Sequence, residues 1–127
     1  NTNKGHSRDF LVVGGMGHAN QIALGLALSN SERHVVCLDG DGAIIMHMGA
    51  MAIIGTLEPK NLLHIVLNNG AHDSVGGQKT AALDIDLSMI AKSSGYRHIV
   101  SAENERDVIQ ALSKIAKLKG PVFFVII

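Results

Sequence analysis

Short apolar runs alternate with longer mixed stretches along the whole chain. The apolar runs are rich in β-branched residues and are bounded by glycine, asparagine or charged residues, which is the pattern of strands separated by turns. They predict five strands, over residues 9–13, 34–39, 61–68, 97–101 and 121–127. The run HVVCLD at 34–39 is apolar between its ends, as expected for a strand that is covered on both faces of a sheet.

The stretches between these strands predict helices over residues 18–29, 43–55, 85–96 and 103–120. The last helix is the clearest, because Val108, Leu112 and Ile115 form an apolar stripe between an acidic start and a lysine-rich end. Residues 43–55 carry no formal charge and are too few to cross a bilayer, so we expect a buried helix there. Residues 69–84 are expected to be irregular.

This alternation predicts an α/β fold, a doubly wound parallel sheet of about five or six strands with helices on both faces. In such sheets, ligands bind beyond the carboxyl ends of the strands. Glycine and polar residues gather after three of the predicted strands, at 14–17, 39–42 and 68–77. We expect these three segments to lie on the same rim of the sheet.

Composition narrows the function without naming it. The chain has 127 residues, of which 46% are hydrophobic, so it can bury one substantial core. Its 11 basic and 11 acidic residues leave no net charge, which argues against nucleic acid and membranes as partners. Cys37 lies in an apolar run and cannot form an internal disulfide, which fits a reducing, cytoplasmic location.

The two ends of the chain suggest a piece of a longer protein. The opening NTNKGHSRD is polar and does not resemble a signal peptide, so residues 1–8 are expected to be a linker or boundary. The other end, PVFFVII, stops within an apolar strand. Residues 9–127 are then the domain proper.

The most informative stretch is VVCLDGDGA, where two aspartates follow a buried strand. A charge at such a junction is costly unless something binds it. Gly40 and Gly42 let the backbone approach an anion, and a helix that begins near Ala43 would point its free N–H groups at that anion. Asp39 could instead cap the turn.

Asp41 and Asn69 offer oxygen atoms at the ends of successive strands. Carboxylate and amide oxygens are ligands that Mg²⁺ accepts, and Mg²⁺ commonly shares them with a substrate's phosphates. The sequence therefore predicts a magnesium and phosphate site at this rim, with Asp41 facing a cation.

A dinucleotide-binding site is the rival interpretation. Gly15-x-Gly17 follows a predicted strand, and Asp39 lies twenty-four residues after Gly15, as in the fingerprint that binds a pyrophosphate and a ribose. However, Asn20 stands at the third glycine position, and Asp41 would have no role.

The sequence GDG, then twenty-five residues, then NN resembles the motif of enzymes that use thiamine diphosphate. A Gly-x-Met sequence precedes the aspartate by the distance found in the decarboxylase and acetolactate synthase branches. The resemblance implies that the Gly14 carbonyl accepts a bond from the aminopyrimidine and that Met16 bends the cofactor. It also implies that Asp41, Asn69 and the backbone carbonyl of Ala71 ligate Mg²⁺.

The segments 9–29, 35–56 and 64–80 are more closely similar to the phosphonopyruvate decarboxylases, with the sulfopyruvate decarboxylases as near relatives. This resemblance implies decarboxylation of a 2-oxo acid. The first candidate reaction converts phosphonopyruvate to phosphonoacetaldehyde and CO₂, and sulfopyruvate is the alternative substrate. His18 is a candidate phosphate contact on this account.

The resemblance also implies a missing half. In these enzymes a glutamate on a pyrimidine-binding domain activates the cofactor, and no segment here looks like that domain. We therefore expect a partner domain or subunit and a homo- or hetero-oligomer. The candidate substrate contacts are His72, Ser74 and Gln78, with Lys79 beside them. A non-catalytic scaffold subunit is the remaining alternative.

Other polar residues have structural explanations. Asn68 is expected to fix the loop geometry, and His47 to bond a backbone carbonyl. His64 flanks a predicted strand and is expected to do nothing chemical. Met46, Met48 and the other methionines of that helix are expected to fill the core.

Overall fold

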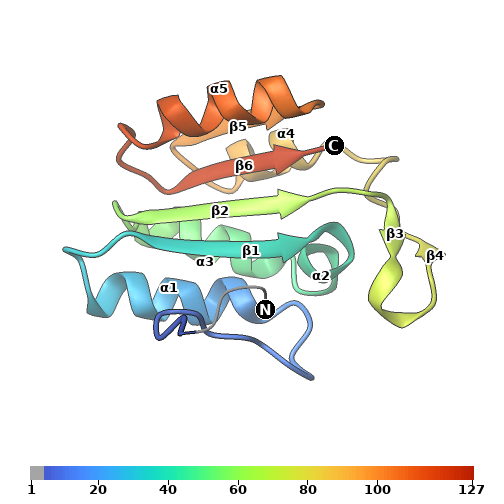
Figure 1. The fold of residues 1–127 in the computed structure, drawn as a ribbon, viewed down its shortest axis with the longest axis horizontal. Helices are drawn as coiled ribbons and strands as arrows, with labels where there is room; N and C mark the ends of the chain where they lie inside the picture. Colours follow the sequence, from blue (N-terminus) through green and yellow to red (C-terminus); the bar gives the residue numbers. More distant parts are fainter. Residues whose placement is uncertain (1–4) are drawn as a thin grey trace.

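The computed structural model describes residues 5–127, and its centre is a parallel four-stranded sheet in the order β1-β2-β6-β5 (Figure 1). The strands are β1 (Val35–Gly40), β2 (Leu62–Leu67), β5 (His98–Ala102) and β6 (Val122–Ile126). The α/β class with a parallel sheet is confirmed. The strand number is lower than the five or six expected.

Helices cover both faces of this sheet. The helices are α1 (Ala19–Ser29), α2 (Asp41–Met46), α3 (Gly49–Leu57), α4 (Leu87–Ser93) and α5 (Glu105–Ile115). Alternate residues of β6 point to opposite faces, so Phe123 and Val125 join the core beneath α1–α4, while Val122 and Phe124 join a second core beneath α5. Within residues 5–127, no helix is long and apolar enough to span a bilayer.

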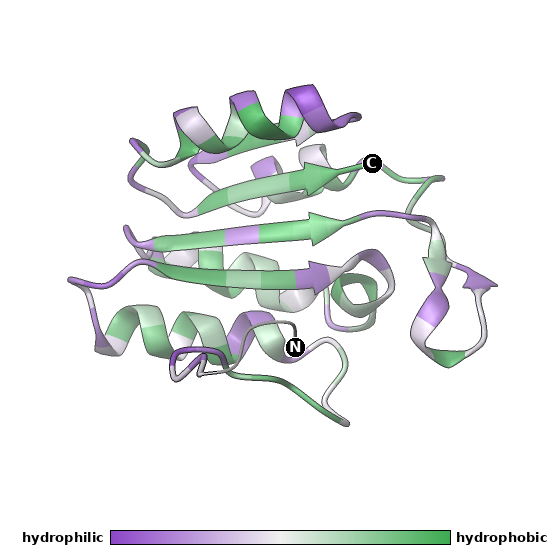
Figure 2. Ribbon diagram, viewed as in Figure 1, coloured by the Kyte–Doolittle hydropathy of each residue, from purple (hydrophilic) through white to green (hydrophobic). Residues whose placement is uncertain are grey.

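Local sequence explains where two of the helices begin. The Asn104 side chain accepts a hydrogen bond from the Asp107 N–H at the start of α5, and Asp86 does the same for Met89 at the start of α4. Both helices are shorter than the ranges predicted for them. Figure 2 shows the strands as largely hydrophobic and the outer side of α5 as polar, which is the expected amphipathic pattern.

The predicted strand at residues 9–13 is not formed. Phe10, Leu11 and Val13 are 68%, 66% and 90% exposed, and in the described residues no strand pairs with β1 on the side away from β2. A strand is stabilised by hydrogen bonds to a neighbouring strand. This apolar run does not pair with the free edge of β1 and therefore lies outside the sheet. Of the linker expected at residues 1–8, residues 1–4 lie outside the described part of the chain.

The predicted helix at 43–55 is two helices, α2 and α3, which meet at His47. His47 leaves helical geometry, with φ −132° and ψ 45°, and its ring lies 4.1 Å from the ring of His18. A Cβ on Gly17 would lie 2.8 Å from the Ala43 carbonyl oxygen and would also meet His47. The glycine turn before α1 therefore packs directly against α2, and the chain bends beyond this contact.

The stretch expected to be irregular, 69–84, contains a small hairpin. It consists of β3 (Ala71–His72), a 3₁₀ turn η1 (Asp73–Val75) and β4 (Gln78–Lys79), with the two strands antiparallel. The hairpin stands beyond the carboxyl ends of β1 and β2 (Figure 1).

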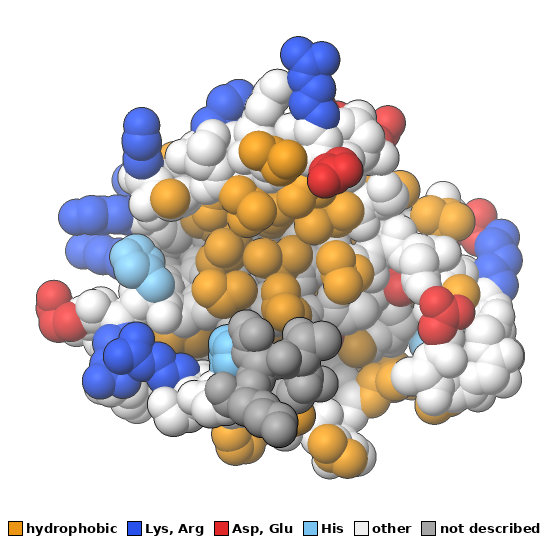
Figure 3. All heavy atoms as spheres, in the orientation of Figure 1, with side chains coloured by type: hydrophobic (Ala, Val, Ile, Leu, Met, Phe, Trp, Pro, Cys, Tyr) orange, Lys and Arg blue, Asp and Glu red, His pale blue; other side chains and the backbone are white. Residues whose placement is uncertain are grey.

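The sheet face that carries α5 is only partly covered. Val36 and Leu38 of β1 and Leu67 of β2 are each more than half exposed on this face. Figure 3 shows an apolar surface in the centre of the view, beside α5. Apolar surface of this kind is uncommon in the exposed sheets of monomeric proteins.

Candidate functional site

A pocket of about 570 Å³ opens at the carboxyl ends of β1, β2 and β6. Its size is that of a small-molecule site. Nine of the twelve predicted site residues line it: Met16, Gly40, Asp41, Gly42, Ala43, Asn69, Ala71, His72 and Ser74. Gly14, His18 and Gln78 are not among the lining residues. The three segments expected on one rim therefore all reach this pocket.

Asp41 is the buried charge of the pocket. It is 2% exposed and is the first residue of α2. The Thr80 hydroxyl donates a hydrogen bond to its Oδ2, and the described part of the chain provides no other hydrogen bond to this carboxylate. A buried carboxylate needs more compensation than one hydroxyl supplies. Asp41 is thus suited to bind a cation from the pocket.

Asn69 follows β2 and lines the same pocket as Asp41. Its Oδ1 accepts the Ala71 N–H at 3.0 Å, which makes an Asx turn, and its Nδ2 donates to Asp73 Oδ2 at 2.6 Å. The amide oxygen has a second lone pair and can accept a further partner. Asp41 and Asn69 thus both line this pocket, and each carries a type of oxygen that Mg²⁺ accepts as a ligand.

Asn68 holds the loop that carries Asn69. Its Oδ1 accepts the Gly70 N–H at 3.3 Å, and its Nδ2 donates to the Ala82 carbonyl at 3.4 Å. These two hydrogen bonds agree with the expectation that Asn68 fixes the geometry of the loop.

The glycine turn before α1 brings Met16 to the pocket. Met16 is 36% exposed, and the positive φ of Gly17, 86°, forms the turn that follows it. His18 stands at the N-cap of α1 with its ring against His47. His47 makes no hydrogen bond to a carbonyl among the described residues, so the bond expected for it is not present.

The hairpin contributes the other wall. The imidazole of His72 packs against Gly42, where a Cβ would displace the ring. Ser74 also lines the pocket. Gln78 pairs with His72 across the β3–β4 hairpin but does not line the pocket. Lys79 lies on the surface, 3.4 Å from Asp84.

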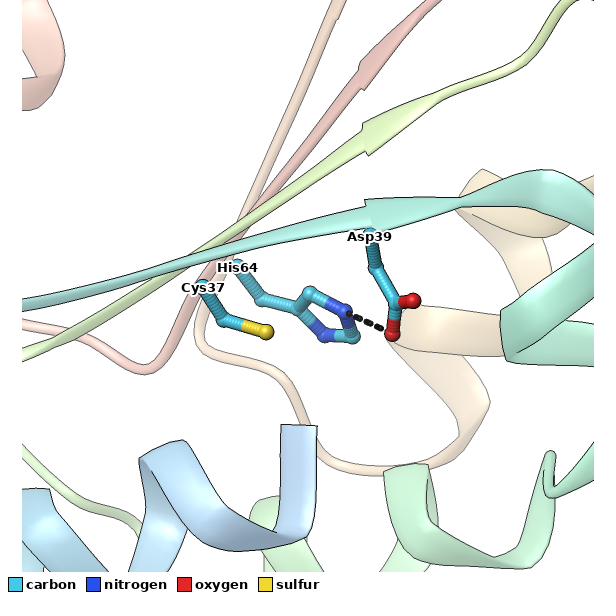
Figure 4. A group of neighbouring side chains, drawn as sticks. All are labelled: Cys37, Asp39 and His64. Carbon is cyan, nitrogen blue, oxygen red and sulfur yellow. Dashed lines mark hydrogen bonds and ion pairs between the residues drawn. The ribbon is translucent and has the colours of Figure 1, made fainter. Parts of the chain in front are cut away.

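Asp39 points away from the pocket, into the core beneath β1. Its Oδ2 accepts the Asn20 Nδ2–H at 3.1 Å and lies 3.4 Å from His64 Nε2 (Figure 4). His64 Nδ1 lies 2.8 Å from the Tyr96 hydroxyl. A neutral His64 that donates from Nε2 and accepts at Nδ1 satisfies both contacts. Asp39 therefore neither caps the turn nor remains free for a ribose, and the dinucleotide interpretation loses its acidic residue.

Cys37, Asp39 and His64 place their ligand atoms within 4.8 Å of one another, which raises the question of a second metal site. All three are buried, and both ring nitrogens of His64 already have partners. Burial, and then the charge of Asp39, raise the pKa of the Cys37 thiol to about 12, so the sulfur keeps its proton at neutral pH. Burial likewise raises the pKa of Tyr96. The group is a buried core cluster in which Asp39 and His64 are hydrogen-bonded.

Two contacts of the buried aspartates were not predicted from the sequence. His64 was expected to flank a strand and to do nothing chemical, but it lies within β2, is fully buried and contacts Asp39. Its place within an apolar strand was the available signal. Thr80 gave no signal, because its bond to Asp41 joins residues 39 positions apart.

Three comparisons with known proteins agree on one family. Residues 2–126 match the model of the thiamine pyrophosphate enzyme, C-terminal TPP binding domain. The chain is 42% identical over 112 residues to a phosphonopyruvate decarboxylase of Streptomyces viridochromogenes, which covers 88% of this chain and 28% of that protein. It is 40% identical over 116 residues to the sulfopyruvate decarboxylase subunit beta of Methanothermobacter thermautotrophicus, which covers 91% of this chain and 60% of that subunit.

A solved structure is similar in fold. It is that of a protein from Mycobacterium smegmatis proposed to be a thiamin diphosphate-dependent enzyme, with a TM-score of 0.73 and 28% identity. The match covers 89% of this chain and 22% of that one. This chain thus spans less than two thirds of the length of each relative described here.

Proposed function

This chain belongs to the C-terminal TPP binding domains of the thiamine pyrophosphate enzymes, and from that membership we propose that it supplies the diphosphate- and Mg²⁺-binding half of a 2-oxo acid decarboxylase. The observation that carries the proposal is the shared pocket of Asp41 and Asn69. Their oxygens come from the ends of neighbouring strands and match the ligands of Mg²⁺ bound to a diphosphate.

The ion would be held by the Asp41 carboxylate, the Asn69 amide oxygen and the backbone carbonyl of Ala71. Gly40 and Gly42 would leave room for the diphosphate beside them. The fit is supported by the single hydrogen bond that Asp41 receives in the described structure, which leaves its other oxygen available.

The organic part of the cofactor would lie toward the glycine turn. Met16, which lines the pocket, would support the bent form of the cofactor, and the Gly14 carbonyl would accept a bond from the aminopyrimidine. Gly14 and His18 do not line the pocket in this structure. Their proposed contacts with the cofactor would form only when the cofactor or the partner half completes the site.

Bound thiamine diphosphate supplies an electron sink for the carbanion that remains when CO₂ leaves a 2-oxo acid. This chain's residues would orient it and exclude water. Leu67, Ile126 and Ile127 give the pocket an apolar wall, which strengthens the electrostatic interactions of Asp41 within it.

For the substrate we favour phosphonopyruvate, which would yield phosphonoacetaldehyde and CO₂. His72 and Ser74 line the pocket and could donate hydrogen bonds to a phosphonate, with Gln78 on the adjacent strand β4. Sulfopyruvate is the second candidate, because a sulfopyruvate decarboxylase subunit is nearly as similar to this chain.

The other half of the site would come from a pyrimidine-binding domain or subunit, in a homo- or hetero-oligomer. This is supported by the greater length of the relatives. The 127-residue chain alone is therefore expected to show no decarboxylation.

The test is an assay of the complete enzyme with thiamine diphosphate and Mg²⁺, with phosphonopyruvate and sulfopyruvate compared by kcat/KM. We expect CO₂ release that depends on both the cofactor and the ion, with phosphonopyruvate preferred. A preference for sulfopyruvate would reverse the substrate assignment. Activity that is independent of thiamine diphosphate would refute the function.

A further inference from the structure

Thr80 connects the two segments that carry the proposed metal ligands. It follows β4 and is 6% exposed, outside the pocket lining. Its backbone N–H donates to the Gly70 carbonyl at 2.9 Å, next to Asn69, while its hydroxyl bonds Asp41. Thr80 is thus hydrogen-bonded both to the start of α2 and to the loop after β2.

The direction of the hydroxyl bond is determined by its neighbours. The Ala82 N–H lies 3.2 Å from Thr80 Oγ1 and can only donate. The single hydroxyl proton of Thr80 is therefore free to go to Asp41 Oδ2. This leaves Asp41 Oδ1 as the oxygen that can face a cation.

The Thr80 segment is itself held against the loop after β2. The Asn68 Nδ2 donates to the Ala82 carbonyl, and a Cβ on Gly70 would lie 2.6 Å from Leu83 Cδ1. These contacts fix the backbone on both sides of the Thr80 hydroxyl, so the hydroxyl has a defined position beside Asp41.

We propose that Thr80 is a positioning residue that holds the Asp41 carboxylate for monodentate binding of Mg²⁺ and couples it to the Asn69 loop. The inference rests on the proposed function, since it assumes that Asp41 is a metal ligand. Mg²⁺ requires near-octahedral geometry, whereas Ca²⁺ accepts bidentate carboxylates. A carboxylate with one oxygen engaged by Thr80 thus favours the smaller ion.

The test compares Thr80→Val with Thr80→Ser in the complete enzyme. Binding of Mg²⁺ and of Ca²⁺ is measured by calorimetry in the presence of thiamine diphosphate. Valine keeps the branched shape and removes the hydroxyl, while serine keeps the hydroxyl. Thr56→Val, which removes an exposed hydroxyl from α3, is the matched control.

Thr80→Val is expected to weaken Mg²⁺ binding by about 10- to 100-fold, the usual effect of losing a group that orients a metal ligand. Ca²⁺ binding should fall less, so the preference for Mg²⁺ over Ca²⁺ declines. Thr80→Ser and Thr56→Val should keep the wild-type affinity and preference.

Asp41→Asn separates this inference from the proposed function. If Asp41→Asn loses Mg²⁺ binding while Thr80→Val keeps both affinity and preference, the role of Thr80 is overturned and the metal site stands. If Asp41→Asn binds Mg²⁺ like the wild type, the metal site and the inference both fail. Equal losses in Thr80→Val and Thr80→Ser would also overturn the role of the hydroxyl.

The wild-type enzyme provides a test that needs no variant to fold. In a crystal structure with Mg²⁺ and thiamine diphosphate, Asp41 should bind the ion through one oxygen, with Thr80 on the other. Bidentate binding by Asp41 would contradict the inference.

Discussion

Asp39 and Asp41 are two residues apart at the same strand end, and both are buried, yet their surroundings differ completely. Asp39 lies beneath the sheet, where Asn20 donates to it and His64 lies within 3.4 Å. Asp41 begins α2, lines the pocket and receives one hydrogen bond, from Thr80, in the described structure. A carboxyl group with internal partners stabilises the fold, whereas one with an open oxygen in a pocket is suited to a ligand.

This comparison separates stability from binding. Alternation along β1 turns Cys37 and Asp39 into the core, and the following Gly40 releases the chain into α2 with Asp41 at its start. Variants of the two aspartates should therefore fail in different assays.

The largest effect is expected for Asp41→Asn. The amide keeps the size of the side chain and can still accept from Thr80, but it removes the charge that faces the ion. Mg²⁺ affinity in the presence of thiamine diphosphate should fall at least about 100-fold, which corresponds to about 2.7 kcal/mol. Calorimetry on the complete enzyme measures this.

Asp84→Asn is the control for this substitution, because Asp84 is an exposed carboxylate whose ion pair with Lys79 lies on the surface. It should bind Mg²⁺ like the wild type. Equal losses of Mg²⁺ affinity in both variants would mean that the overall negative charge of the chain, and not a ligand at position 41, governs Mg²⁺ binding.

The second effect is expected for Asp39→Asn and appears in stability. The amide can keep one oxygen toward Asn20 and His64, but it removes the negative charge that strengthens both hydrogen bonds, so the free energy of unfolding should fall by about 2 kcal/mol. Urea denaturation of the complete enzyme measures the loss. Mg²⁺ affinity should change much less than in Asp41→Asn. If Asp39→Asn lost as much Mg²⁺ affinity as Asp41→Asn, the two aspartates would not have the different functions assigned to them.

The smallest effect concerns Cys37, which belongs to the same buried cluster. Its pKa is raised from 9.0 to about 12 in the folded protein, so between these values the unfolded state releases a proton that the folded state keeps. Stability therefore falls as pH rises through this window. From pH 8 to pH 10 the wild type should lose about 1 kcal/mol more than Cys37→Ala.

Urea denaturation at the two pH values measures this difference. The other side chains are common to both proteins, so the difference between wild type and variant isolates the contribution of the thiol. Parallel pH profiles would show that the thiol ionises as easily in the folded protein as in the unfolded one.

The alternation of apolar runs predicted the parallel sheet and its two helical layers, because burial on both faces leaves a direct mark on each strand. The shared pocket of Asp41 and Asn69 was also predictable, since both residues follow strands whose carboxyl ends lie at the same edge of the sheet. These features depend on local pattern and on the geometry of parallel sheets.

Features that depend on distant neighbours were not accessible. Residues 9–13 have the composition of a strand, but they do not pair with the free edge of β1, and composition alone does not determine pairing. The break at His47 follows from contact with Gly17 and His18, which no helix propensity encodes. Thr80 and His64 acquire their importance only when residues far apart in the chain meet.

The central claim is that Asp41 and Asn69 bind one divalent ion. The most direct test is a crystal structure of the complete enzyme grown with thiamine diphosphate and Mn²⁺, whose anomalous scattering locates the metal. We expect one peak between the two side chains, with metal–oxygen distances of about 2.1 Å, close to those of Mg²⁺. A peak at Cys37, Asp39 and His64, or none near Asp41, would contradict it.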